Sequence, residues 1–223
     1  MLDIFFILKI LPYLAEGLIT TFQVSLTSFA IGLALAVLLT PARVLGRLPL
    51  SGVARSYIEV IRGTPVLVQL FIIYFGLPSL GMKFDPLTAS IIALGLNSAA
   101  YQAEILRASI KSIPESQYLS AESLGMSTGQ IYRYVVLPQS IRIAVPALVN
   151  ELVTLVKESS IVSVIGVVEL MRKGDYMVAS TFRAFEVYLG VAIIYFLVCF
   201  LLSQLSKIVE EKLKIPGYER GSQ

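Results

Sequence analysis

Five stretches of this chain are each long and apolar enough to cross a lipid bilayer. A membrane-spanning helix needs about 20 mostly apolar residues, and a backbone in lipid must satisfy its own polar groups, which favours helices. The sequence therefore predicts an all-α, polytopic membrane protein in which residues 1–223 form a single transmembrane domain. Pro65 is expected to set a bend or a helix start. The predicted spans are residues 14–40, 57–77, 87–110, 141–168 and 187–209.

The composition supports a membrane protein and excludes several kinds of site. Hydrophobic residues make up 56% of the chain and charged residues 15%, with a mean hydropathy of +0.79, whereas soluble domains carry about 25% charged residues. With no His and one Cys, a His-based triad, a His-containing zinc site and an intrachain disulfide are impossible. The sequence has no G-x-x-x-x-G-K-S/T loop to cradle phosphates. We expect a chain that is not an enzyme, without catalytic residues and without a cofactor or metal of its own.

The basic residues predict the orientation of the chain, because cytoplasmic loops are enriched in Lys and Arg. Five basic residues lie in the loops on one side, namely Lys9, Lys83, Arg172, Lys173 and Arg183. Twelve lie on the opposite side, namely Arg43, Arg47, Arg55, Arg62, Arg107, Lys111, Arg133, Arg142, Lys207, Lys212, Lys214 and Arg220. The N-terminus is therefore expected outside and the C-terminus in the cytoplasm.

The polar stretch PESQYLSAESLGMSTGQIYRYVVLP, residues 114–138, interrupts the apolar chain between the third and fourth spans. By the predicted orientation it is cytoplasmic, and residues 112–138 predict two short helices that meet at a glycine. The signals are Ser112 and Pro114 at the first start, Gly125 at the first end, Ser127 or Thr128 at the second start and Pro138 at the second end. A plain loop needs no such caps, so we expect a docking surface.

The same stretch carries a family resemblance. Gly125, nine residues and then Val135-Val136-Leu137-Pro138 resembles the cytoplasmic signature of ABC importer permeases. Three further blocks resemble the polar amino acid branch of that family, and the resemblance runs from about residue 15 to 210. They are RGTPVLVQ at 62–69 with YFGLP at 74–78, AAYQAEI at 99–105 with Arg107, and SLGMS at 123–127 with LPQSIR at 137–142.

One position departs from the family pattern. The family's Glu-Ala-Ala triplet falls on Leu119, Ser120 and Ala121, so the acid is missing at its usual place. Glu122, one turn further on, could take its role on nearly the same helix face. The resemblance thus implies an ATPase-coupling surface formed by Leu119, Ser120, Ala121, Glu122, Gly125, Leu137 and Pro138.

The resemblance also implies partners and a mechanism. Such permeases work in pairs, either two copies or two sister chains, with two cytoplasmic ATP-binding subunits that hold ATP and Mg. An extracytoplasmic solute-binding protein delivers the amino acid, and no nucleic acid is involved. The implied location is the cytoplasmic (inner) membrane of a prokaryote, as a multi-pass protein, and the implied mechanism is alternating access.

Two faces of polar residues in the apolar spans are candidates for substrate binding. Asn97, Tyr101 and Glu104 share one helix face. Glu151 and Glu158 share another, and Thr154 lies beside Glu151. Carboxylates are costly in lipid, and several lining one cavity would favour a cationic amino acid. Structural alternatives stay open for two of them, because Glu104 could pair with Arg107 and Glu158 with Lys157.

Two other kinds of transport protein fit the sequence less well than an ATP-driven permease. An ion-coupled secondary amino acid transporter would also place a carboxylate such as Glu151 near the midplane, but five spans without a repeat argue against it. An ion channel would need a selectivity filter, and no filter-like motif occurs in the sequence.

Overall fold

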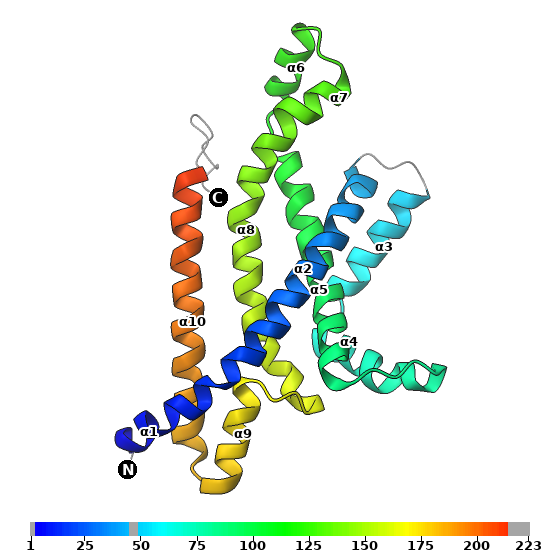
Figure 1. Ribbon diagram of the computed structural model, residues 1–223. Helices are drawn as coiled ribbons and strands as arrows, with labels where there is room; N and C mark the ends of the chain where they lie inside the picture. The colour runs from blue at the N-terminus through cyan, green and yellow to red at the C-terminus, as the bar shows by residue number, and fades with distance from the viewer. Residues whose placement is uncertain (1–2, 45–48, 214–223) are drawn as a thin grey trace.

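Four long helices form the body of the computed structural model, which describes residues 3–44 and 49–213. They are α2 (Gly17–Val44), α5 (Pro86–Lys111), α8 (Leu137–Glu158) and α10 (Ala184–Leu213). Helices α10 and α8 stand side by side, α2 crosses diagonally over α8 and α5, and the short helix before it, α1 (Ile4–Ala15), lies against α10 (Figure 1). The described residues contain no strand, so the all-α prediction is confirmed. Arg47, Lys214 and Arg220, which entered the orientation count, lie outside the described residues.

The long helices differ in whether their length and hydropathy are sufficient to identify them as membrane spans. Helices α2 and α10, of 28 and 30 residues, are long and apolar enough to cross a membrane. The bent pair formed by Leu50–Arg62 and Val66–Leu80 could supply a third span. Helices α5 and α8, of 26 and 22 residues, reach roughly 39 and 33 Å at 1.5 Å per residue but are less apolar. The third and fifth predicted spans coincide closely with α5 and α10.

The second predicted span, residues 57–77, is wrong as a single crossing helix. Helix α3 (Leu50–Arg62) ends at Gly63, and α4 (Val66–Phe71) then starts in a new direction, at an angle of 105°. Helix α4 continues as a π-helical turn η1 (Ile72–Gly76) and a 3-10 turn η2 (Leu77–Leu80). The cause is Pro65, whose ring disfavours a helical conformation of Thr64 and whose own ψ of 137° is extended.

The first and fourth predicted spans also have different limits. The first span was predicted from residue 14, but Leu14 still lies in a separate helix, α1 (Ile4–Ala15), and α2 begins only at Gly17. The fourth, predicted to residue 168, is α-helical to Glu158 and continues as a 3-10 segment, η4 (Ser159–Ile165). A further helix that the sequence did not predict, α9 (Leu170–Thr181), fills the following loop.

Two ion pairs join the segments at the end of the molecule that the sequence predicts to be outside. Lys173 of α9 donates to Glu16 at 2.8 Å, and Arg183 contacts Asp3 at 2.9 Å. The hydrogen bond to Glu16 raises the pKa of the Lys173 ammonium. A backbone N–H and then Arg183 lower the pKa of the Asp3 carboxyl. These pairs join the N-terminal helix to the segment that connects α8 and α10.

The seam between α2 and α5 depends on a glycine. A Cβ on Gly32 would lie 2.9 Å from Gln102 Nε2 and 3.1 Å from the Ala99 nitrogen. Close to it, Ser28 Oγ donates to the Ile91 carbonyl across the seam at 3.2 Å. The absence of a side chain at Gly32 therefore lets the two backbones approach.

We expect Gly32→Ala to destabilise the protein by about 1–3 kcal/mol, because the added methyl group overpacks this seam. The midpoint of thermal unfolding in detergent would fall. Gly52→Ala on α3 is the matched control, because a Cβ there meets no atom within 4 Å and Ala favours a helix by up to about 1 kcal/mol. Equal midpoints for the two variants would contradict the role given to Gly32.

The polar segment forms a separate lobe beyond the ends of the long helices (Figure 1). It consists of α6 (Glu115–Ser123), α7 (Thr128–Ile131) and a π-helical turn, η3 (Tyr132–Val136). The predicted glycine joint is confirmed, since Gly125 has a φ of +77°. Ser127 is the N-cap of α7, and its backbone N–H donates to Gln130 Oε1 at 2.8 Å.

Two predicted boundaries in this lobe are wrong. Ser112 is the C-cap of α5, and Pro114, not Ser112, is the N-cap of α6. Pro138 does not end the second helix, because η3 runs directly into α8 with Pro138 in its first turn. The π turn explains this tolerance: the Leu137 N–H reaches back five residues to Tyr132, and the wider turn accommodates a proline that has no N–H to donate.

Candidate functional site

A buried polar network lies where α5 meets α8. Ser98 Oγ of α5 donates to Glu151 Oε1 of α8 at 2.8 Å. Ser98 in turn accepts a hydrogen bond from Gln102 Nε2 at 2.8 Å, one turn further along α5. No Lys or Arg of the described residues lies within 4 Å of the half-buried Glu151 carboxylate. A carboxylate held by one hydroxyl and no cation retains capacity to accept a positively charged partner.

Gln102 links this network to the third helix. Its Nε2 also lies 3.2 Å from the Phe29 carbonyl of α2, while its Oε1 is buried without a hydrogen-bond partner. The side chain is fully buried. The sequence reasoning missed both Gln102 and Ser98 as site residues. The available signal was an uncharged polar pair four residues apart, on one face of an apolar span.

The structure separates Asn97 and Tyr101 from the Glu151 network. Asn97 is buried and donates to Gln69 Oε1 of α4 at 3.3 Å. Gln69 in turn donates to the Ile61 and Thr64 carbonyls at 2.8 and 2.9 Å, and so caps the bend at Pro65. Arg62 of α3 lies over the ring of Tyr101 at 5.2 Å. These two residues therefore point toward the bent pair α3–α4 and not toward α8.

Glu104 forms the ion pair that the sequence left open. It accepts from both Arg107 Nε, at 2.9 Å, and Arg107 Nη2. Arg43 at the end of α2 adds a second guanidinium at 3.8 Å. Glu104 thus joins the C-terminal ends of α2 and α5. Its negative charge is balanced by these arginines, as the structural alternative from the sequence proposed.

The other two residues predicted on α8 make only local contacts in the described structure. Thr154 Oγ1 donates to the Asn150 carbonyl one turn earlier, at 3.2 Å. Glu158 is half-buried at the last residue of α8. Lys157 is exposed, and within residues 3–44 and 49–213 no ion pair joins it to Glu158. Two turns of α8 separate Glu151 and Glu158 on one face.

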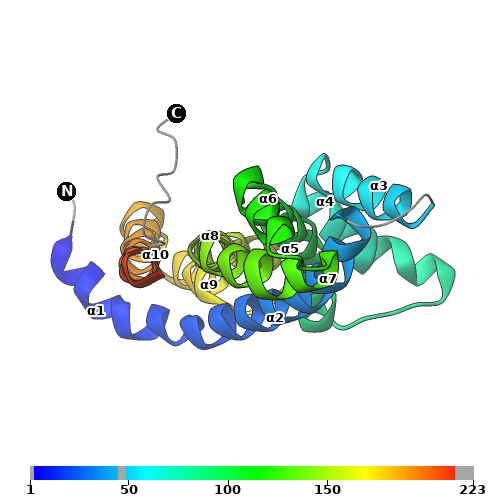
Figure 2. The ribbon, with the colours of Figure 1, turned by 90° about the horizontal axis from the view of Figure 1, so that it is seen from above.

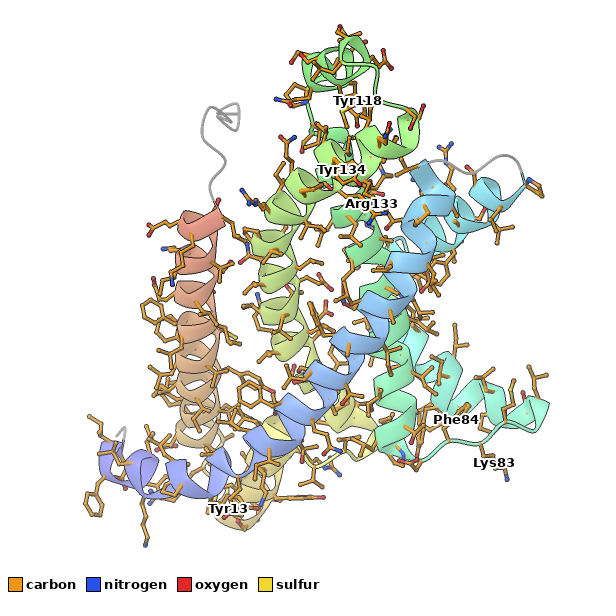
Figure 3. All side chains as sticks on the ribbon, turned by 45° about the horizontal axis from the view of Figure 1, so that its top comes forward. Tyr13, Lys83, Phe84, Tyr118, Arg133 and Tyr134 are labelled. Atoms are coloured by element: carbon orange, nitrogen blue, oxygen red, sulfur yellow. The ribbon has the colours of Figure 1, made fainter. Side chains whose placement is uncertain are left out.

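The polar lobe has its own small core and an exposed outer surface. Ala121, Ile131 and Val136 are buried together, and Tyr118 packs against Tyr132 with ring centroids 6.3 Å apart. Tyr118 lies in the part of the lobe away from the long helices, and Arg133 and Tyr134 lie where the lobe meets them (Figure 3). Among the predicted coupling residues Ala121 therefore faces inward. The others, Leu119, Ser120, Glu122, Gly125, Leu137 and Pro138, are exposed.

Leu119 occupies the position where the related pattern has an acid. Its side chain is 56% exposed, and that of Leu124 is 81% exposed. Glu122 is also exposed, and its carboxylate makes no ion pair with the described residues. Helix α6 thus presents apolar side chains and an unengaged carboxylate at its surface, which is an arrangement suited to a protein partner.

Comparison with known proteins identifies the family. Residues 32–215 match the family of binding-protein-dependent transport system inner membrane components. The chain belongs to this family. It is therefore a multi-pass permease subunit of the inner membrane and not an enzyme, and the ATPase activity of such systems resides in separate subunits. Partners that hydrolyse ATP and bind the solute follow from the family in general.

Individual relatives match along nearly the full length of the permease. It is 40% identical to the arginine transport system permease protein ArtQ of Bacillus subtilis, over 92% of this chain and 94% of ArtQ. It is 38% identical to the glutamine transport system permease protein GlnP of Escherichia coli, with the same coverage of 92% and 94%.

Solved structures share the fold. A crystal structure of an amino acid ABC transporter with histidines has a TM-score of 0.91 at 41% identity, covering 95% of this chain and 99% of that chain. The methionine ABC transporter MetNI in an inward-facing conformation has a TM-score of 0.72 at 21% identity, covering 96% and 100%. The second match reports on the fold alone.

Proposed function

We propose that this permease passes polar amino acids, with a preference for cationic ones, through the cytoplasmic membrane of a prokaryote by alternating access. The names of similar permeases supply the amino acid class, since ArtQ is an arginine permease and GlnP a glutamine permease. The observation that carries the cationic preference is the Glu151 carboxylate, held by Ser98 at 2.8 Å without an ion pair among the described residues. An ammonium or guanidinium group on a substrate would supply the missing charge.

The proposed substrate site comprises Glu151, Thr154 and Glu158 of α8, together with Asn97, Tyr101 and Glu104 of α5. The α8 carboxylates are its centre, because Glu104 already has two guanidinium partners. Asn97 and Tyr101 would reach the substrate only if α3 and α4 moved relative to α5. Such a movement is the kind of change that alternating access requires.

The proposed topology has five spans, an outer N-terminus and a cytoplasmic C-terminus. Its spans are α2, the bent pair α3–α4, α5, α8 and α10. The basic residues of the sequence support it, because twelve Lys and Arg lie on the side assigned as cytoplasmic and five on the opposite side.

In this proposal the lobe α6–α7–η3 receives the movement of the ATP-binding subunits. Helix α6 offers Leu119 and Leu124 as apolar anchors beside the Glu122 carboxylate, and η3 transmits displacement into α8 without a break. Two permease chains, identical or sister, would complete the translocation path. Two ATP-binding subunits and a solute-binding protein would complete the importer, with ATP and Mg held by the ATP-binding subunits.

The direct test is uptake into proteoliposomes that contain the purified complex. We expect labelled arginine to accumulate only with ATP inside and the solute-binding protein outside. Uptake that follows an imposed ion gradient without ATP would contradict an ATP-driven importer. Labelled glutamine, measured in parallel, reports the preference between cationic and neutral amino acids.

A separate prediction concerns the acid missing at Leu119. If Glu122 makes that contact with the ATP-binding subunit, Glu122→Ala is expected to lower binding-protein-stimulated ATPase activity about fivefold, as for the loss of about 1 kcal/mol. Glu115→Ala is the control, because Glu115 is also exposed on α6. Equal stimulation in the two variants would show that Glu122 has no such role.

A further inference from the structure

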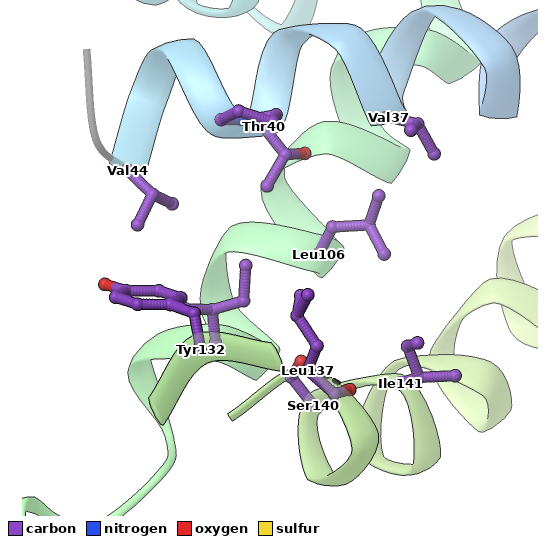
Figure 4. Close-up of a pocket in the computed structure, with 10 residues that line it drawn as sticks. Val37, Thr40, Val44, Leu106, Tyr132, Leu137, Ser140 and Ile141 are labelled. Carbon is purple, nitrogen blue, oxygen red and sulfur yellow. Dashed lines mark hydrogen bonds between the residues drawn. The ribbon is translucent and has the colours of Figure 1, made fainter. Parts of the chain in front are cut away.

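An apolar crevice lies at the end of the long helices where the polar lobe begins (Figure 4). Its volume is about 430 Å³. Val44 and Tyr132 lie toward one end and Val37 and Ile141 toward the other (Figure 4). Val37 and Ile141 are 54% and 56% exposed, so the crevice opens between α2 and α8. Seen from above, α2 runs along an outer edge of the molecule (Figure 2).

The polar groups in the wall of this crevice are already satisfied. Thr40 Oγ1 donates to the Ala36 carbonyl at 2.7 Å, and Ser140 Oγ donates to the Leu137 carbonyl at 3.1 Å. Both bonds lie within a single helix, so neither hydroxyl hydrogen is directed to a ligand. The remaining lining residues contribute hydrocarbon surface, apart from the Tyr132 hydroxyl. The occupant that such a wall selects is therefore apolar.

The size of the crevice distinguishes between apolar occupants. One turn of an α-helix fills roughly 420 Å³, for a diameter of about 10 Å and a pitch of about 5.4 Å. A volume of about 430 Å³ thus holds about a single turn, so a membrane-spanning helix of a partner could only lie across its opening. A thin, flexible polymethylene chain can enter from the open side between α2 and α8.

Basic residues flank the lining residues of the crevice in the sequence. Five basic residues, each adjacent in sequence to a lining residue, come from every element that lines it: Arg43, Arg107, Lys111, Arg133 and Arg142. Arg43 and Arg107 are paired with Glu104. Lys111 and Arg133 are exposed without an ion pair among the described residues, and Arg133 lies where the lobe meets the long helices (Figure 3). Basic pockets on the cytoplasmic side of spans attract anionic headgroups.

We propose that the crevice binds one acyl chain of an anionic phospholipid of the cytoplasmic leaflet, whose headgroup lies beside Lys111 and Arg133. The bound chain contacts α2 at Val37, α5 at Leu106 and the start of α8 at Leu137, so it braces the polar lobe against the spans. This inference rests on the cytoplasmic placement of the lobe in the proposed function. Its test measures lipid retention without any transport, so the two proposals can fail separately.

The purified complex in detergent is titrated with phosphatidylglycerol or phosphatidylcholine, and adducts are counted by native mass spectrometry. We expect one retained phosphatidylglycerol per permease chain and weaker retention of phosphatidylcholine. Val37→Trp, which fills the open end, should abolish the adduct. Leu38→Trp is the matched control, because Leu38 is the next residue of α2, is 72% exposed and does not line the crevice. Equal adducts in the two variants would overturn the proposal.

The headgroup contact is tested by a charge-removal pair. The double variant Lys111→Gln and Arg133→Gln is expected to bind phosphatidylglycerol about thirtyfold more weakly, at the usual contribution of a basic residue near an anionic surface. Lys207→Gln with Lys212→Gln removes the same charge from the end of α10 and should have little effect. Equal loss of phosphatidylglycerol binding in both double variants would show that any nearby positive charge attracts the lipid. That result would overturn the specific headgroup contact.

A protein occupant is tested by crosslinking. Val37→Cys in a Cys199→Ser background, oxidised in the purified complex or treated with a short bifunctional thiol reagent, is expected to stay uncrosslinked. A crosslink to another chain would show that a subunit, and not a lipid, covers the crevice, and would overturn the proposal.

Discussion

Replacing Glu151 by Gln is expected to lower arginine uptake about tenfold to a hundredfold and to change glutamine uptake far less. The amide keeps the shape of the side chain and its hydrogen bond with Ser98, but it removes the negative charge. A hydrogen bond to a charged group contributes about 1.5–3 kcal/mol, and each 1.4 kcal/mol is a factor of ten. The ratio of arginine to glutamine uptake in proteoliposomes measures this loss directly.

The control for charge is Glu59→Gln, because Glu59 is an exposed carboxylate of α3 that bonds Arg55 at 2.7 Å. Ser98→Ala separates charge from orientation: it leaves the Glu151 carboxylate in place and removes its one described donor. We expect about a tenfold loss of arginine uptake from Ser98→Ala, as for one hydrogen bond to a charged group of about 1.5 kcal/mol. An unchanged uptake ratio in Glu151→Gln would remove Glu151 from the substrate site.

Replacing Glu169 by Ala is expected to destabilise the permease by about 2–5 kcal/mol. Glu169 is fully buried at the N-cap of α9. Its carboxylate accepts hydrogen bonds from the Met171 and Arg172 backbone N–H groups and from the Tyr195 hydroxyl of α10, each at 2.8 Å. Loss of an N-cap costs about 0.5–2 kcal/mol, and a buried hydroxyl left without its partner adds about 1–3 kcal/mol.

The thermal unfolding midpoint in detergent and the yield of purified complex measure this effect. Asp85→Ala is the matched control, because Asp85 also caps a helix through two backbone N–H groups, at 3.0 and 3.1 Å, but at an exposed position. A double-mutant cycle of Glu169→Ala with Tyr195→Phe isolates the contact between α9 and α10. Equal destabilisation by Glu169→Ala and Asp85→Ala would contradict the cross-helix role of Glu169.

Local signals in the sequence predicted much of the fold. Apolar runs of sufficient length found α5 and α10, because a run of about 20 apolar residues is a property of the segment itself. The lobe was predicted from Gly125, whose positive φ suits glycine, and from Ser127 as a cap. The bend between α3 and α4 was predicted only in part. Pro65 was expected to set a bend or helix start, but residues 57–77 were still predicted as one span.

The candidate site was less predictable. Helical periodicity placed Glu151 and Glu158 on one face of α8 correctly, because the period is fixed by the backbone. The same reasoning grouped Asn97, Tyr101 and Glu104, but each of them has a different partner in the structure. Residues on one helix face still point in somewhat different directions and lie at different heights, so each of them can contact a different neighbouring helix.

Length, apolarity and short motifs are local properties, so they were enough to predict an all-α membrane protein that resembles a binding-protein-dependent permease. Which polar groups meet depends instead on how the helices pack. Ser98 and Glu151 are 53 residues apart, and Glu169 and Tyr195 are 26 residues apart. Each contact depends on which helices pack together and at what angle. That choice is made by the packing of whole surfaces, such as the close approach at Gly32, and no single segment encodes it.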